Sequence, residues 1–189
     1  LGLMNKLNKA HQEVRNGVWD REGNRGEELD GKTIGIIGYG NNGAAFAKKL
    51  RGFDVRVLAY DKYKSGFGDY QVQECTLEAL QEQADILSFH VPQNKETKLF
   101  FNSEFLGQMA KPFYLLNLSR GKVVATSALV EGLKSGQIKG AGLDVLEYEQ
   151  KSFEAFFDQE MPADFQYLVA ADNVCLTPHV GGWTTESYV

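Results

Sequence analysis

The chain has 189 residues, 43% of them hydrophobic, so it can bury one good core, and we expect a single domain with at most a short appendage. Its formal net charge of −5 at pH 7 argues against a nucleic-acid-binding surface or an anionic membrane as partner, because neither would be attracted by the overall field. No apolar run approaches the roughly 18 residues of a membrane span, and Cys75 and Cys175 lack the spacing of a metal site or a disulfide framework, which favours a reducing, cytoplasmic setting.

The first 31 residues predict a helix followed by a crossing loop. Residues 3–15 carry apolar side chains at helical spacing, namely Leu3, Leu7, Ala10 and Val14. Residues 16–31 are charged and glycine-rich, with Trp19 as their only large apolar anchor, so we expect an ordered loop. The helix stripe and the aromatic segment 149–172 would form a large exposed patch on a monomer. We therefore expect both to bury surface against a second copy, giving a homodimer.

From residue 32 onward, short apolar runs alternate with helical patterns. Strands are expected at residues 33–37, 54–60, 85–90, 113–118, 140–146 and 174–176, with a weak one near 71–72. Helices are expected at residues 41–50, 77–83, 103–109 and 127–134, whereas residues 150–172 are expected to be irregular. Alternating units of this kind specify an α/β fold with a Rossmann-like doubly wound, mostly parallel sheet and helices on both faces. Ligands of such sheets bind at the carboxyl ends of the strands.

The first expected strand is followed by Gly38, Gly40 and Gly43 in the G-x-G-x-x-G spacing of a dinucleotide site. This site needs a sharp turn at the first glycine, close approach of a pyrophosphate at the second and close helix packing at the third. The pyrophosphate would lie on the N–H groups that begin the next helix, near Asn41 and Asn42. A glycine-rich turn alone is common between strand and helix, but its context here favours the cofactor site.

Asp61 follows the second expected strand, 18 residues beyond Gly43. A carboxylate at this position binds the ribose hydroxyls and repels a 2′-phosphate, so the pattern favours NAD over NADP. Lys62 and Lys64 follow closely and weaken that preference.

Four further strand ends carry polar groups, in the segments 90–92, 117–121, 144–149 and 177–182. A histidine, an arginine and carboxylates at one sheet edge suggest hydride transfer to or from a carbonyl, with NAD carrying the hydride. The planar fork of Arg120 suits a substrate carboxylate. His179 suits the general acid/base, and a neighbouring carboxylate, most plausibly Glu149, would favour its protonated form.

Each of these residues also has a purely structural interpretation. Arg120 alone could be a surface or helix-capping cation, and Glu149 or Asp144 a loop acid or turn former. His179 could satisfy loop backbone groups, and His90 could simply pack at its strand end. The joint arrangement, more than any single residue, favours catalysis.

The motifs resemble the cofactor domain of the D-isomer-specific 2-hydroxyacid dehydrogenase family. The similarity covers nearly the whole chain and is most specific at residues 117–121, 140–145 and 177–182. The resemblance implies NAD-dependent interconversion of a small D-2-hydroxy acid and its 2-oxo acid. It implies that Arg120 binds the 2-oxo acid, that Glu149 pairs with the histidine, and that His179 donates the proton.

The same resemblance implies the cofactor contacts. They are Ser119 and Asp144 along the nicotinamide, His90, Val91 and Pro92 beside the adenosine, and also Thr97 and Gly181. Two positions depart from the family pattern: Asn42 replaces a usual aliphatic residue, and Gln150 a common proline. Neither change removes a catalytic group, and substrate identity stays open.

Family members carry a second, substrate-side lobe, which this sequence contains only in part. We therefore expect residues 1–189 to be the dinucleotide-binding domain, to bind NAD and to be inactive alone, in a fragment of a longer chain. A different class of function is an NAD(H)-sensing interaction protein of the corepressor type, built on the same fold. A third, the formate dehydrogenase branch, pairs its histidine with glutamine, and Glu149 argues against it.

Overall fold

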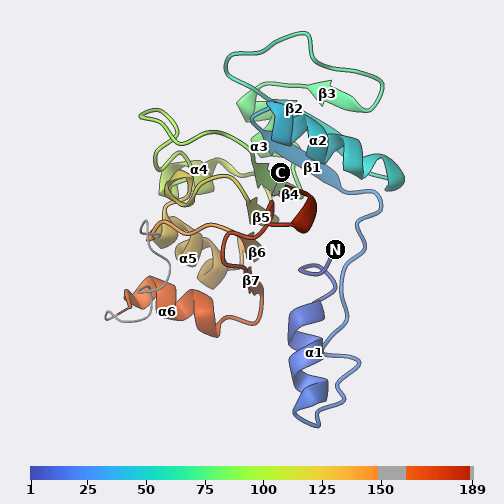
Figure 1. Ribbon diagram of the computed structural model, residues 1–189, viewed down its shortest axis with the longest axis vertical. Coiled ribbons are helices and arrows are strands. Elements are labelled where there is room, and N and C mark those ends of the chain that lie inside the picture. Colours follow the sequence, from blue (N-terminus) through green and yellow to red (C-terminus); the bar gives the residue numbers. More distant parts are fainter. Residues whose placement is uncertain (149–160, 188–189) are drawn as a thin grey trace.

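The computed structural model describes residues 1–148 and 161–187. Within them, the strands form one sheet of seven, all parallel, in the order β3-β2-β1-β4-β5-β6-β7 (Figure 1). Their bounds are β1 Thr33–Ile37, β2 Arg56–Tyr60, β3 Val72–Glu74, β4 Ile86–Phe89, β5 Phe113–Asn117, β6 Ile138–Leu143 and β7 Val174–Leu176. The strand order reverses between β1 and β4, where doubly wound sheets bind ligands. The predicted α/β fold is confirmed.

The described helices are α1 Leu7–Arg15, α2 Asn41–Lys49, α3 Leu77–Gln83, α4 Ser103–Gln108, α5 Thr126–Ser135 and α6 Ala163–Ala170. Short 3₁₀ helices cover Leu50–Gly52, Gly121–Val123 and Thr185–Ser187. Local signals fix several ends. Thr76 and Asn102 accept N–H bonds of α3 and α4 through their side chains, and Gly136 ends α5 in the left-handed conformation.

The core has two parts, one on each face of the sheet. Successive residues of β1 alternate between them: Ile37 packs in the cluster that includes residues of α3, α4, α5 and α6, whereas Ile34 and Ile36 pack with Ala47 of α2. Gly35 has no room for a side chain, because a Cβ there would lie 2.9 Å from Leu80 of α3. Helices therefore cover both faces, as predicted.

The N-terminal segment differs from the prediction in two ways. The helix begins at Leu7 rather than residue 3, because Lys6 is left-handed, with φ of 50°. The preceding turn folds back, so that Met4 is only 5% exposed in the core around Ile34. The expected anchor Trp19 is 84% exposed, so that prediction is wrong. The buried methionine anchors this segment instead.

The aromatic segment before β7 is also more ordered than expected. Residues 150–172 were predicted to be irregular, yet α6 forms within them, directly after Pro162. Phe165 is buried in this helix, and Tyr167 packs on the core with the Lys134 ammonium 5.0 Å from its ring centroid. Burial of the apolar face of α6 outweighs the weak helical pattern of its sequence. The aromatic residues Phe153, Phe156 and Phe157 lie outside the described residues.

Across residues 1–148 and 161–187, none of the helices has the length and apolar character to cross a membrane. In the same ranges, no three His, Cys, Asp or Glu side chains come together in a way that could hold a metal ion.

Candidate functional site

The carboxyl ends of six neighbouring strands are in register. The residues paired across them form one row, which is Tyr60, Ile37, Phe89, Asn117, Leu143 and Leu176. The candidate residues follow this row by one to three positions: Gly38, Asp61, His90, Ser119, Arg120, Asp144 and His179. The sheet thus brings to one edge groups that are far apart in the sequence.

The three glycines after β1 have different surroundings. Gly38 has φ of +93°, and a Cβ there would lie 2.8 Å from Val91 Cγ1. At Gly43 a Cβ would overlap the carbonyl oxygen of Gly38, so the helix could not lie this close to the turn. At Gly40 a Cβ would meet nothing within 4 Å, so the backbone borders open space that a ligand could fill.

Helix α2 begins at this turn with its first N–H groups uncapped by any side chain. Its N-cap residue is Gly40, and the following Asn41 and Asn42 are exposed. A helix start of this kind attracts negative charge through its N–H groups and its dipole. The predicted pyrophosphate position is therefore accessible and electrostatically suitable.

Asp61 links the glycine turn to the end of β2. Its Oδ2 accepts the Tyr39 N–H at 2.8 Å, while Oδ1 accepts the N–H groups of Tyr63 and Lys64 at 2.9 and 3.0 Å. A carboxylate can accept about four hydrogen bonds, so capacity remains for ligand hydroxyls. Asp61 also lines the pocket next to the turn.

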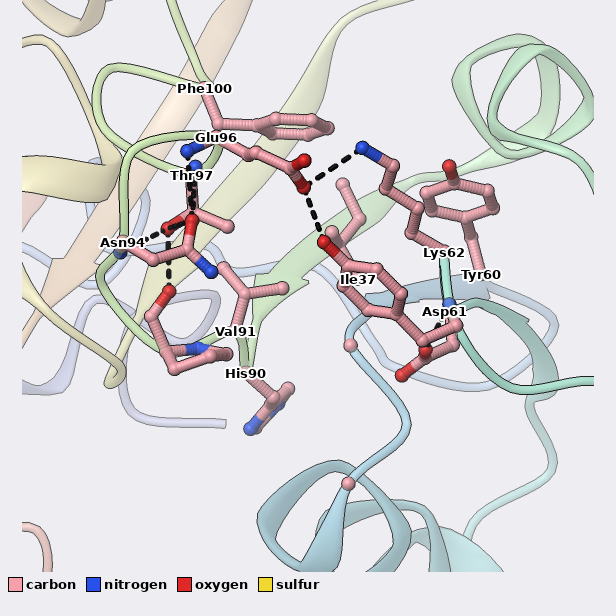
Figure 2. A pocket seen from close by; sticks show the side chains of 14 residues that line it. Ile37, Tyr60, Asp61, Lys62, His90, Val91, Asn94, Glu96, Thr97 and Phe100 are labelled. Carbon is pink, nitrogen blue, oxygen red and sulfur yellow. Dashed lines mark hydrogen bonds and ion pairs between the residues drawn. The ribbon is translucent and has the colours of Figure 1, made fainter.

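That pocket, of about 190 Å³, lies between the loops that follow β1, β2 and β4 (Figure 2). It brings together a group of the predicted cofactor residues: Gly38, Gly40, Asp61, His90, Val91, Pro92 and Thr97. Its other walls were not predicted as site residues, and they are Ile37, Tyr60, Lys62, Tyr63, Asn94, Glu96 and Phe100. Apolar and aromatic walls beside a carboxylate suit a nucleoside, whose base is flat and whose ribose is polar.

His90 lies in the wall of this pocket in a largely desolvated position. Its Nε2 lies 2.9 Å from the hydroxyl of the fully buried Ser88, and its ring packs against Phe46 with centroids 5.1 Å apart. Burial lowers the pKa of His90 from 6.5 to about 4. The ring is therefore neutral at pH 7 and adds no charge to the pocket.

The loop after β4 is shaped by its own side chains. Asn94 Oδ1 accepts the N–H groups of Glu96 and Thr97 at 2.8 and 3.0 Å. The Thr97 hydroxyl donates to the Pro92 carbonyl at 2.6 Å. These bonds turn the loop back over the pocket and place Thr97 in its wall. The sequence analysis did not name Asn94, although Asn favours turns in which its side chain accepts a backbone N–H two residues on, as it does here from Glu96.

Asp144, at the end of β6, organises the loop that follows β7. It is only 5% exposed, and its Oδ1 accepts the Thr177 hydroxyl and the Val180 N–H at 2.6 and 2.8 Å. Its Oδ2 accepts the Gly181 N–H at 2.7 Å. A Cβ at Gly181 would lie 2.8 Å from that oxygen, which explains the glycine. Asp144 and Gly181 thus have a structural role. Their contacts with the cofactor stay predictions.

His179 lies in the same loop, with its side chain exposed. Its backbone N–H donates to the Asp144 carbonyl at 2.8 Å, and its φ of 56° is unusual for a residue with a side chain. A non-glycine residue held in this conformation is often part of a functional loop. The proposed partner Glu149 lies outside the described residues.

Arg120 follows β5 after a turn built by the buried Asn117. The Asn117 amide donates to the Arg120 carbonyl at 3.1 Å, and its Oδ1 accepts the Ser119 hydroxyl at 2.8 Å. The Arg120 side chain is exposed, with Nη1 donating to the Ser119 carbonyl at 2.7 Å. Ser119 is itself only 7% exposed. Asn117 lies in the motif at residues 117–121, but only the folded turn shows that it positions Ser119 and Arg120.

The fold and site together define a class of protein. An all-parallel sheet with a glycine turn where the strand order reverses, an acidic residue after the next strand and a nucleoside-sized pocket between them form a dinucleotide-binding domain of the Rossmann type.

Comparisons with known proteins identify the family. A family model described as "D-isomer specific 2-hydroxyacid dehydrogenase, NAD binding domain" matches residues 1–181, so the chain belongs to this family. A glyoxylate reductase of Thermofilum pendens is 41% identical over 99% of this chain and 54% of its own length. A hydroxypyruvate reductase of Thermotoga maritima is 34% identical, over 99% and 59%.

A solved structure gives the same result. The D-lactate dehydrogenase from Aquifex aeolicus, complexed with NAD and lactic acid, aligns with a TM-score of 0.87 at 30% identity, over 98% of this chain and 58% of that one. The cofactor of the domain is thus NAD. The chain spans about half the length of the curated relatives it matches.

Proposed function

We propose that the whole protein is an NAD-dependent dehydrogenase that interconverts a small D-2-hydroxy acid and its 2-oxo acid. The observation that carries the proposal is the register of β5, β6 and β7. Asn117, Leu143 and Leu176 are paired across these strands, and Arg120 and His179 each follow three residues later. A fork-shaped cation and an imidazole at one edge of an NAD-binding sheet are what reduction of a 2-oxo acid requires.

Each candidate residue has a distinct role in the proposed reaction. NAD, when bound, carries the hydride. Arg120 binds the substrate carboxylate through its planar guanidinium and so orients the carbonyl. His179 supplies the proton to the oxygen, and Glu149 favours its protonated form. Asp144 fixes the His179 loop through its three hydrogen bonds and the backbone contact of His179.

The test is an assay of the full-length protein with NADH and small 2-oxo acids. Glyoxylate, hydroxypyruvate and pyruvate are suitable first probes, since the relatives' names point to this size of molecule. Oxidation of NADH that depends on one of these acids supports the proposal. NADH binding without turnover on any 2-oxo acid would favour the corepressor-type alternative. The cytoplasmic location of the protein and the inactivity of residues 1–189 alone stay predictions.

We expect the protein to bind NADH more tightly than NADPH. The Asp61 carboxylate lies in the pocket wall, and its charge beside a 2′-phosphate would cost roughly one to a few kcal/mol. Fluorescence titration with both reduced cofactors measures the difference. Equal affinities, or tighter NADPH binding, would show that the neighbouring lysines dominate.

We also expect the protein to be a homodimer that buries the outer face of α1. The structure describes no buried residue in this helix, and Leu7 and Val14 are 61% and 51% exposed, with Trp19 close by in sequence. In the second expected contact, the segment 149–172, Phe165 is buried and Tyr167 packs on the core of the same chain, so these two side chains do not belong to an exposed patch as expected. Light scattering at micromolar concentration tests this expectation, and Leu7→Lys should weaken association. A monomer mass for the wild type would refute it.

A further inference from the structure

Two lysines follow the carboxylate that selects between the cofactors. In dinucleotide-binding folds an acid at the end of the second strand binds the ribose 2′-hydroxyl, whereas a cation nearby accommodates a 2′-phosphate. This chain carries the acid, Asp61, and two such cations, Lys62 and Lys64. Sequence alone leaves open which of the two signals prevails.

Lys62 is engaged by a carboxylate from the opposite wall of the pocket. Its Nζ lies 2.8 Å from Oε2 of Glu96, which comes from the loop after β4 (Figure 2). The Tyr63 hydroxyl donates to the same oxygen, so Glu96 joins two residues of the loop after β2. The hydrogen bond raises the pKa of Lys62 and lowers the pKa of Glu96, so both are charged at neutral pH.

Lys64 is engaged as well, by the backbone of the glycine turn. Its Nζ donates to the Tyr39 carbonyl at 3.2 Å, within the glycine turn. A backbone carbonyl does not cancel the charge of Lys64, whereas the Glu96 carboxylate does cancel that of Lys62. Glu96 is therefore the group that decides whether the charge of Lys62 is available beside Asp61 in addition to that of Lys64.

We propose that Glu96 is a specificity-determining residue, which disfavours a 2′-phosphorylated dinucleotide by holding Lys62 in an ion pair across the pocket. The inference rests on the proposed preference for NAD(H). Lys62 and Glu96 are 56% and 53% exposed, so the pair adds little to folding stability and can exchange partners. Its effect is on the ligand: a 2′-phosphate must displace Glu96 from Lys62 or go without that cation.

The experiment compares the dissociation constants of NADH and NADPH for the full-length protein and four variants, one of them a control. Glu96→Gln keeps the side-chain size and removes the charge, which releases Lys62. We expect the ratio of the two constants to shift about tenfold toward NADPH. The double variant Lys62→Gln/Glu96→Gln lacks the cation that Glu96→Gln alone would release. We expect its ratio of the two constants to differ from that of Lys62→Gln by less than about twofold.

Glu22→Gln is the matched control. Glu22 forms an exposed ion pair with Arg25 in the N-terminal loop, and the same change of charge there should leave the ratio of the two constants unaltered. The Glu96→Gln shift should also shrink at high salt, because the freed charge is solvent-exposed.

An unchanged ratio in Glu96→Gln would overturn the inference, and so would a full shift that persists without Lys62. Loss of both cofactors in Glu96→Gln would also overturn it, by showing that Glu96 is needed for the shape of the pocket. Failure of the wild type to prefer NADH would instead refute the proposed cofactor preference itself.

Discussion

In the full-length protein, His179→Ala should lower kcat by about 10²–10⁴-fold while NADH still binds. The loss follows from removal of a positioned general acid, whose contribution is typically of this size. The nucleoside pocket and the glycine turn lie at the ends of β1, β2 and β4, whereas His179 follows β7, so cofactor binding should be spared. Steady-state kinetics with the best 2-oxo acid, together with an NADH titration, measures both quantities.

A second variant distinguishes the chemical role of the His179 imidazole from the effect of the backbone conformation at this position. Because His179 has φ of 56°, a conformation in which His and Asn are enriched, alanine at this position would fit the loop less well than either. Asparagine tolerates the left-handed conformation but cannot serve as the proton donor, so His179→Asn should be as slow as His179→Ala. Recovery of activity in His179→Asn would assign the loss to loop conformation and contradict the role in proton transfer.

The proposed partner of the histidine gives a companion test. Glu149→Gln should shift the upper pH limit of the reduction rate downward, because removal of a neighbouring negative charge makes the imidazolium lose its proton more readily. An unmoved pH–rate profile would show that Glu149 does not pair with His179.

The second large effect concerns stability in acid. Because the pKa of His90 is about 4 in the folded protein and about 6.5 when unfolded, only the unfolded chain takes up this proton between those values. The stability that the neutral His90 ring contributes is fully present above pH 6.5 and is lost as the pH falls toward 4. Protonation of His90 in the unfolded chain should lower the free energy of unfolding by about 2 kcal/mol between pH 7 and about 4.5.

Urea unfolding at the two pH values, for the wild type and His90→Gln, measures this effect. The variant should lose about 2 kcal/mol less on acidification, even if its stability at pH 7 is lower because contacts to Ser88 and Phe46 change. His11→Gln, which alters an exposed histidine of α1, should behave like the wild type. Equal acid losses in His90→Gln and the wild type would contradict a buried neutral ring.

Much of the fold was predictable because its signals are local. The apolar run at residues 33–37 and the glycines after it required no knowledge of the rest of the chain, and the structure has β1 and α2 there. The convergence of distant groups at one edge was also predictable, since parallel strands place their carboxyl ends together. The pairing of Tyr60 with Ile37, and of Ile37 with Phe89, bears this out.

What could not be predicted depends on contacts between segments. The left-handed Lys6 interrupts the helical pattern because Met4 is buried in the core, and no local feature of the sequence predicts that burial. Asp144 was expected along the nicotinamide, but only the folded loop shows three hydrogen bonds to it from residues 177–181. The ion pair of Lys62 with Glu96 joins two loops that are 34 residues apart in sequence.

The product that the full-length protein makes is the decisive test of the proposed dehydrogenase activity. The protein should be incubated with NADH and its best small 2-oxo acid, and the 2-hydroxy acid should be resolved by chiral chromatography. We expect one equivalent of the D-2-hydroxy acid for each NADH oxidised, with formation slowed about 10²–10⁴-fold in His179→Asn. Formation of the L isomer, or tight NADH binding with no 2-hydroxy acid from any 2-oxo acid, would contradict it.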